Sequence, residues 1–321
     1  MIDLKRLVEA TEPLTLAGVP AGFQPWLLAD LARAAKGRAV FVAPDEAAAR
    51  SVIDAATYFA PELHTIFVPA WDTLPYDRAS PSLRVASERI AALAALAAPQ
   101  PGAQLVVTTV NALTQRTMKA ARIASLTARI APGQRIDRDQ LAAKLQANGY
   151  VRSDTVAEAG EFAIRGGLLD LFPAGEELAL RLDFFGDEIE TVRRFDPGSQ
   201  RTVDTSAGFT LLPVSEVLLT EAAIRTFRQG YVETFGATAT GDPLYQAISD
   251  GRRLAGMENW LPLFEPDLAT LFDYFGDDDV FVRDFGTEKA AEQRFEAVAD
   301  YHDNRKAALA TSKGSYRPLA P

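Results

Sequence analysis

The sequence predicts a mixed α/β protein with more than one domain, on three observations. Short apolar segments alternate with amphipathic helical segments over residues 1–124. From residue 125, strand-like segments follow one another with only turn residues between them, and from residue 213 helical patterns return. Strands separated by helices indicate a parallel sheet, whereas strands joined by tight turns indicate an antiparallel meander. With 321 residues, 48% of them apolar, the chain is long enough for two or three domains.

The first domain, residues 1–124, shows the alternating pattern. Its expected elements are helix 24–36, strand 38–44, helix 45–59, strand 64–70, helix 81–98 and strand 104–109. Ser80 is expected to cap the third helix, with Pro81 at its first position, where proline is favoured because that N–H has no partner within the helix. We therefore expect a parallel sheet covered by helices.

The second domain, residues 125–212, is expected to hold one helix, 140–148, and the antiparallel meander. Gly186-Asp187 has the composition of a two-residue hairpin turn between strands 178–185 and 188–195. Such a turn predicts three cross-strand pairs. They are Phe185 with Glu188, Asp183 with Glu190, and Arg181 with Val192.

Because strand side chains alternate with a period of two, the meander residues divide into two faces. The face expected in the core holds Phe162, Ile164, Leu178, Leu180, Leu182 and Phe184. The face expected to be exposed holds Glu161, Ala163, Arg165, Ala179, Arg181, Asp183 and Phe185. This pattern allows two interpretations: solvated strand residues with Phe185 covered by a neighbouring domain, or a protein-docking patch, since aromatic and arginine side chains are typical of interface hot spots.

The third part, residues 213–321, returns to helical patterns. Its expected elements are helices 221–235, 243–249 and 287–309 and one strand, 279–284. Thr220 and Asp242 stand where the N-caps of the first two helices would be.

Composition argues against several classes of function. The chain has no cysteine and only two histidines, which disfavours a metal site or a Ser-His-Asp enzyme. A net charge of -10 disfavours strong binding to nucleic acid, although the basic stretch 116–138 could contact a phosphate backbone. The longest apolar run, 90–98, is too short to span a membrane, and no signal sequence follows Met1. We expect a cytoplasmic protein with a protein partner.

Residues 16–32 lie where an α/β nucleotide-binding domain would carry its phosphate loop. Gly18 and Gly22 are present, but Phe23, Gln24 and Pro25 follow, so the Lys-Ser or Lys-Thr pair of a working loop is missing. We therefore expect no ATP hydrolysis, no bound cofactor and no metal in this chain.

Three strings of the sequence are recognisable together. GEFAIRGGLLDLFPAGEELALRLDFFGDEIETVRRFDPGSQRT resembles the UvrA-binding module shared by UvrB and the bacterial transcription-repair coupling factors. PAWDTLPYDRASPSLRVASERIAAL and AGMENWLPLF extend the resemblance over nearly the whole chain. The coupling factors are the more similar family, because the phosphate loop is lost and the tyrosine-rich insertion with which UvrB clamps damaged DNA has no counterpart.

For the fold, this resemblance implies a degenerate RecA-like, helicase-like parallel-sheet domain with an inserted α+β UvrA-binding domain. It further implies the amino-terminal region of a larger ATP-driven DNA translocase, whose motor would use ATP and Mg²⁺. In that family the translocase displaces RNA polymerase stalled at a DNA lesion, and this region recruits UvrA for nucleotide excision repair. The family's own carboxy-terminal domain masks the same surface.

The family's UvrA-contacting positions fall on Arg165, Arg181 and Phe185. Strand alternation or cross-strand pairing could bring three further residues beside them: Glu161, Asp183 and Arg194. Two other functions are weighed against this one. They are a stand-alone nucleotide-binding α/β enzyme and a UvrB-like protein that binds DNA through residues 116–138.

Overall fold

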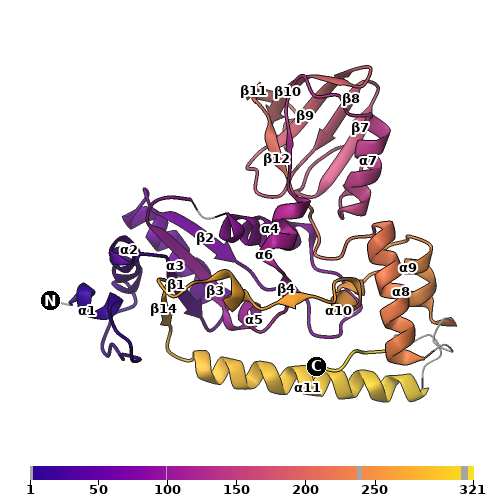
Figure 1. Cartoon of the computed structure of the whole chain (residues 1–321). Helices are drawn as coiled ribbons and strands as arrows, with labels where there is room; N and C mark the ends of the chain where they lie inside the picture. The colour runs from indigo at the N-terminus through magenta and orange to yellow at the C-terminus, as the bar shows by residue number, and fades with distance from the viewer. Residues whose placement is uncertain (1–2, 99, 237–240, 312–316) are drawn as a thin grey trace. The chain divides into compact units, whose positions relative to one another are not determined.

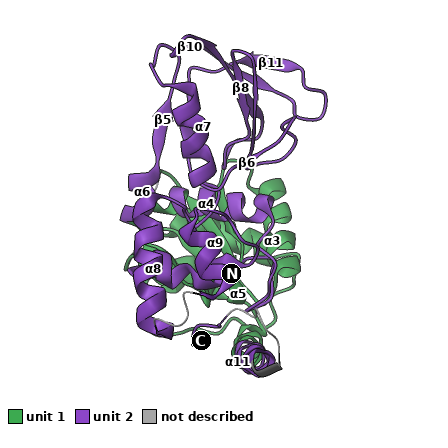
Figure 2. Cartoon of the chain, turned by 90° about the vertical axis from the view of Figure 1, so that its right-hand side faces the viewer, with its two compact units in different colours: residues 1–70, 95–120, 269–297 green, residues 71–94, 121–268, 298–321 purple. Residues whose placement is uncertain are grey.

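The computed structural model describes residues 3–98, 100–236, 241–311 and 317–321 (Figure 1). The chain forms two compact units, each assembled from segments far apart in the sequence (Figure 2). The first unit comprises residues 1–70, 95–120 and 269–297, and the second comprises residues 71–94, 121–268 and 298–321. The expected three-part division at residues 124 and 212 stays a prediction.

The first unit contains the predicted parallel sheet, with strands in the order β14-β1-β3-β2. These strands are β1 (Ala39–Ala43), β2 (His64–Val68), β3 (Gln104–Thr109) and β14 (Val280–Arg283). Its helices include α1 (Leu4–Val8), α2 (Gln24–Ala34), α3 (Glu46–Phe59) and α5 (Val110–Leu113), with the 3-10 turn η3 (Leu271–Tyr274). Strands β1 and β3 are buried along their whole length, and α2 and α3 pack on them through an apolar core, which confirms the expected α/β class.

Strand β14 joins this sheet from a distant part of the sequence. It pairs in parallel with β1, with Ala39 opposite Val280. Arg38 and Asp279, which precede the two strands, form a largely buried ion pair of 3.1 Å. This pair therefore helps to hold the late strand at the edge of the early sheet.

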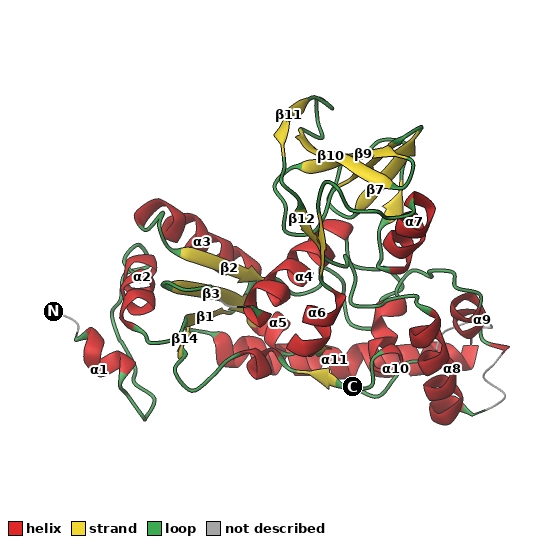
Figure 3. Ribbon diagram, turned by 45° about the horizontal axis from the view of Figure 1, so that its top comes forward, coloured by secondary structure: helices red, strands yellow, loops and turns green. Residues whose placement is uncertain are grey.

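The second unit contains a six-stranded sheet in the order β11-β10-β9-β8-β7-β6 (Figure 3). Its strands are β6 (Val151–Arg152), β7 (Glu161–Arg165), β8 (Leu168–Leu171), β9 (Ala179–Phe185), β10 (Glu188–Phe195) and β11 (Thr202–Thr205). All neighbouring pairs are antiparallel except β6 with β7, which confirms the predicted meander. Helix α7 (Arg138–Ala147) lies beside this sheet and buries Leu141 and Leu145.

The remaining elements are short strands and helices. They are β4 (Thr117–Met118), α6 (Ala120–Leu126), β5 (Ala128–Ile130), β12 (Phe209–Leu211), α8 (Glu221–Phe235), α9 (Pro243–Ser249), η2 (Met257–Trp260), α10 (Leu261–Phe264), β13 (Leu268–Ala269) and α11 (Thr287–Thr311). The expected bounds of α8 and α9 and the caps Thr220 and Asp242 are confirmed, since both caps accept a backbone N–H.

Two helix starts differ from the expectation by two residues. Helix α7 begins at Arg138, earlier than expected, because Asp137 caps it. Helix α4 spans Leu83–Ala97, two residues later than expected. Ser82, rather than Ser80, accepts the N–H of Val85 at 3.4 Å. The Ser80 hydroxyl instead donates to Glu258 at 2.7 Å, a tertiary contact that the local sequence does not reveal.

A buried ion pair anchors α4 inside the second unit. The Nε of Arg89 donates to Oε2 of Glu216 at 2.9 Å, and both side chains are almost fully buried. The indole nitrogen of Trp71 donates to the same oxygen at 3.0 Å. Because an isolated buried charge is costly, removing either partner would leave a strongly unfavourable group in the core.

The WDTLPYD and AGMENW segments, quoted above for the resemblance, pack against each other. The Asn259 side chain accepts the N–H of Tyr76 at 3.1 Å and donates to the carbonyl oxygen of Asp77 at 2.8 Å. Ser80, three residues after WDTLPYD, donates to Glu258 of AGMENW. The two strings are therefore parts of one packed site in the second unit.

A glycine makes this close approach possible. Gly256 has a φ of +78°, and a Cβ added there would lie 2.7 Å from the backbone oxygen of Asp77. We expect Gly256→Ala to lower the free energy of unfolding by about 2 kcal/mol, because it combines backbone strain with a clash against backbone atoms.

Urea unfolding measures this loss. Gly276→Ala is the matched control, since a Cβ at Gly276 meets no atom within 4 Å. Equal unfolding midpoints for the two variants would contradict the close packing of WDTLPYD on AGMENW.

Candidate functional site

The β9–β10 hairpin positions the side chains of greatest interest. Phe185 pairs with Glu188 across the turn, as predicted. The next two expected pairs are wrong, because a β-bulge at Glu190 shifts the register by one residue. As a result Asp183 lies opposite Thr191, and Arg181 lies opposite Arg193. A bulge inserts one unpaired residue and so reverses the facing of every later residue on its strand.

The core face of the sheet is largely as predicted. Its fully buried side chains are Phe162, Leu169, Leu171, Leu180, Leu182, Ile189 and Val192. Ile164 and Phe184 are only partly buried, and Leu178 lies just before β9. This apolar layer supports the strands from beneath and leaves the opposite face available for polar side chains.

Part of that opposite face is covered. The expectation that Ala163 and Ala179 are exposed is therefore wrong. Ala163 and Ala179 are 1% and 0% exposed. They form a small apolar cluster with Val156 and Phe195, against which Phe172 packs. Strand alternation identified the face correctly but could not reveal that a loop folds over part of it.

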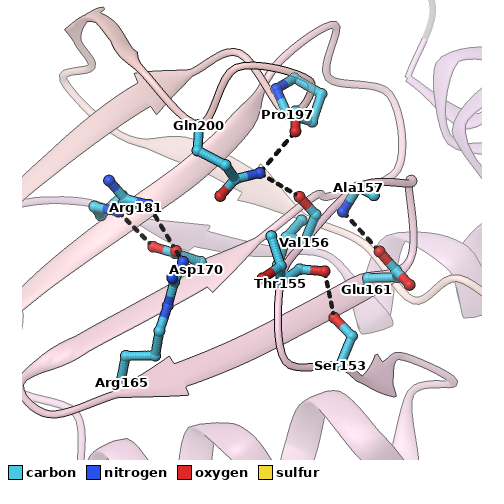
Figure 4. Close-up of polar contacts among 10 residues, drawn as sticks. All are labelled: Ser153, Thr155, Val156, Ala157, Glu161, Arg165, Asp170, Arg181, Pro197 and Gln200. Carbon is cyan, nitrogen blue, oxygen red and sulfur yellow. Dashed lines mark hydrogen bonds and ion pairs between the residues drawn. The ribbon is translucent and has the colours of Figure 1, made fainter.

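Polar contacts hold this covering loop in place (Figure 4). The Glu161 carboxylate accepts the N–H groups of Ala157 and Glu158 at 2.7 and 3.0 Å. The Gln200 amide donates to the carbonyl oxygen of Val156 at 2.9 Å. Glu161 therefore supports the loop at the opposite end of β7 from Arg165.

At the centre of the uncovered part lies Asp170, on β8, which is 1% exposed. Its Oδ1 accepts from Nε of Arg181 at 2.7 Å, and its Oδ2 accepts from an Nη of Arg181 and an Nη of Arg165, each at 2.8 Å (Figure 4). The Arg181 guanidinium also lies over the Phe195 ring, 4.7 Å from its centroid. One buried carboxylate thus holds both predicted arginines.

The hydrogen bond to Asp170 is the main cause that raises the pKa of Arg181 above its ordinary value. The two arginines differ in how far they reach solvent, since the Arg165 side chain is 48% exposed and that of Arg181 only 15%. Arg165 therefore offers the more accessible positive charge.

A second ion pair lies beside the first. Asp183 Oδ2 accepts from Arg193 and from the Thr191 hydroxyl, each at 2.6 Å. Phe185 lies at the end of β9, before the hairpin turn, and is 76% exposed. We call this surface the candidate face and define it by Arg165, Asp170, Arg181, Asp183, Phe185, Thr191 and Arg193.

Arg194 does not lie on the candidate face. The bulge places it opposite Leu180, on the side of the sheet that carries the core. There it forms two hydrogen bonds with Asp204, of 2.7 and 2.6 Å. The arginine of β10 that lies opposite Arg181 is Arg193.

Three members of the candidate face were missed: Asp170, Thr191 and Arg193. Two signals in the sequence could have found them. Asp170 is the only charged residue in the apolar run LLDLF, and alternation separates it from Leu169 and Leu171. Ile189 and Val192 are three residues apart, so both can face the core only if the strand contains an extra residue.

The other candidate segments from the sequence, residues 16–32 and 116–138, do not form a shared site in the described residues. Gly18 has a φ of +73°, and α2 begins at Gln24 without a side-chain cap. Arg122 of the basic stretch pairs with Glu265 at 2.9 Å, and Arg138 donates to the carbonyl oxygen of Gly166. The described residues contain no group of three or more acidic or histidine side chains placed to hold a metal ion. None of the described helices combines the length and apolar character of a membrane span.

The geometry predicts that Arg181 contributes more to the stability of the fold than Arg194 does. We expect Arg181→Ala to lower the free energy of unfolding by about 2 kcal/mol, because it removes two of the three bonds to buried Asp170. Arg194→Ala is the matched control, since it breaks a similar pair in solvent, where ion pairs contribute little. Urea unfolding compares them, and an equal or larger loss for Arg194→Ala would contradict the role given to Asp170.

Comparison with known proteins identifies the region that contains the candidate face. Residues 128–217 match the family described as the UvrB interaction domain, a range that contains the whole candidate face. The chain is also similar to three transcription-repair-coupling factors. That of Escherichia coli strain K12 is 38% identical over 90% of this chain and 25% of its own length. Those of Haemophilus influenzae and Myxococcus xanthus are 34% and 33% identical over 91% and 92% of this chain.

This chain thus spans about a quarter of the length of these curated relatives. Because it covers 90% or more of this chain, the similarity extends to both compact units. The chain is a homologue of the transcription-repair-coupling factors over about a quarter of their length, with a UvrB interaction domain at residues 128–217.

Proposed function

We propose that this chain is the UvrA-recruiting region of a transcription-repair-coupling factor. The observation that carries the proposal is Phe185, a large aromatic side chain that is 76% exposed on the face of the sheet where Asp170 holds Arg165 and Arg181. Exposed aromatic and arginine side chains dominate the binding energy of many protein interfaces. The position of this surface inside the UvrB interaction domain supports UvrA as its partner.

In this proposal Phe185 is the apolar anchor and Arg165 the charged contact. Asp183 takes part through Arg193, which it holds at 2.6 Å. Arg181 and Glu161 support the surface, because their polar groups are already engaged with Asp170 and with the covering loop. Arg194 lies on the other side of the sheet and is not included.

The larger setting follows from the relatives. The whole protein would be an ATP-dependent DNA translocase that displaces RNA polymerase from a lesion, with ATP and Mg²⁺ bound by its motor. Its carboxy-terminal domain would mask the candidate face until UvrA is needed. Because transcription takes place in the bacterial cytoplasm, this activity would be cytoplasmic. The stand-alone enzyme and the DNA-binding protein are less favoured, since neither explains the exposed aromatic on the same face as the arginines.

Binding to UvrA tests the proposal directly. We expect Phe185→Ala to weaken the affinity for UvrA by about 2 kcal/mol, roughly 30-fold. The substitution removes an aromatic side chain that would be buried against UvrA in the complex, and with it the contacts that this side chain makes there. Titration calorimetry with purified UvrA measures the change.

Phe285→Ala is the matched control, because Phe285 is also a phenylalanine in solvent, 97% exposed, and lies in the first unit. It should bind UvrA like the unchanged chain. Equal affinity for Phe185→Ala and Phe285→Ala would overturn the proposed function.

We further propose that this chain neither binds nor hydrolyses ATP. The sequence has Phe23, Gln24 and Pro25 where a phosphate loop needs its lysine and hydroxyl residue, so phosphate and Mg²⁺ lose their main ligands. Equilibrium dialysis with labelled ATP and Mg²⁺ should show no saturable binding at micromolar concentrations, with an intact P-loop protein as the positive control. Saturable binding would favour the nucleotide-dependent enzyme instead.

A further inference from the structure

We propose that Asp170 is the positioning residue of the candidate face, and that, together with Arg181, it orients Arg165 to receive a carboxylate of UvrA. This inference rests on the proposed function. It adds the chemical nature of the contact and a residue that does not itself touch the partner. Asp170 is 1% exposed, so its influence on binding must pass through the two arginines.

The register of the sheet explains why Asp170 holds both arginines. On its strand it lies between Ala163 of β7 and Arg181 of β9, with its side chain on the candidate face. Arg165 lies two residues along β7 from Ala163, on the same face, and reaches back to Oδ2. The small side chain of Ala163 leaves room for this approach. The arrangement is therefore built into neighbouring strands, which are rigid compared with loops.

The charges of this cluster do not balance. Two guanidinium groups share one carboxylate, which leaves one positive charge at the surface. The adjacent pair of Arg193 and Asp183 is neutral by itself. A partner that supplies one carboxylate would complete the cluster, and charge-assisted bonds to a guanidinium are among the strongest polar contacts in proteins.

The donor atoms show which arginine meets that carboxylate. Asp170 occupies Nε and one Nη of Arg181, but only one Nη of Arg165. Among the described residues, the other nitrogens of Arg165 donate no hydrogen bond to protein. Arg165 is thus aimed by Asp170 yet keeps donors for the partner, while Arg181 mainly completes the support.

Fixing the arginines before binding lowers the entropy lost in the complex. Asp170→Asn keeps the size of the side chain but removes its charge, so both guanidinium groups become more mobile. We expect dissociation from UvrA to accelerate about tenfold, the effect of ordering two long side chains on binding. Association should quicken only slightly, since the face gains net positive charge.

Surface plasmon resonance with immobilised UvrA measures both rates. Asp204→Asn is the matched control, because it removes the carboxylate of a similar two-bond pair with Arg194 on the other side of the sheet. It should leave the dissociation rate unchanged. An equal acceleration by Asp170→Asn and Asp204→Asn would overturn the positioning role.

A double-mutant cycle separates positioning from general damage to the fold. In an Arg165→Ala background, Asp170→Asn should change the dissociation rate only about twofold, because the group it positions is gone. A tenfold effect that persists in this background would contradict the proposal. If Phe185→Ala and Arg165→Ala leave UvrA affinity unchanged, the proposed function itself fails. If both weaken binding but Asp170→Asn does not, only this inference fails.

Arg165→Lys tests the same idea without touching a buried group. Arg165 is half exposed, so the variant should fold normally. A lysine keeps the charge but cannot hold Asp170 and a second carboxylate with one planar fork, and we expect dissociation about tenfold faster. Arg194→Lys is its control. Unchanged dissociation for Arg165→Lys would show that charge alone is sufficient and would overturn the proposal.

Discussion

A single buried carboxylate organises the functional surface of this molecule. Asp170 accepts three hydrogen bonds from Arg165 and Arg181, and its burial makes those bonds necessary, since an unpaired charge in that position would be strongly unfavourable. The same constraint makes the arginines rigid. A polar cluster that stabilises the sheet therefore also presents an ordered pair of positive charges on the face that carries the exposed ring of Phe185.

The surrounding elements hold this polar cluster in position. The apolar face of the six-stranded sheet anchors its strands, and the loop held by Glu161 and Gln200 covers part of the other face. The bulge at Glu190 brings Arg193 rather than Arg194 next to Arg181. Phe185, at the end of β9, remains 76% exposed. The result is a small patch whose polar groups are fixed and whose aromatic ring is available.

Much of the fold could be predicted from the sequence, because the signals are local. Periodicity located β1, α3, α8 and both strands of the hairpin to within a residue or two, and Asp45 and Thr220 cap their helices as such residues usually do. The start of α4 was missed because Ser80 is drawn into a bond with Glu258, 178 residues away. The pairing of β14 with β1 is equally non-local.

The candidate site was predictable only in part. Alternation placed Arg165, Arg181 and Phe185 on one face, but a hairpin turn does not reveal a bulge two residues later. Asp170 was overlooked because its partners depend on the order of strands, which periodicity does not contain. Ala163 and Ala179 were misassigned to solvent because a loop covers them. The errors at Asp170 and the two alanines thus concern tertiary contacts, and the resemblance to known families supplied the partner that no pattern could name.

Hydrogen exchange of this chain with and without UvrA examines the whole proposed interface at once. Amides around the ends of β7 and β9, near Arg165 and Phe185, should exchange more slowly in the complex, because binding excludes water and holds the hairpin closed. The amides around Arg194 and Asp204, and those of residues 16–32, should be unaffected. Protection confined to the first unit or to residues 116–138, with none at the hairpin, would contradict a docking role for the candidate face.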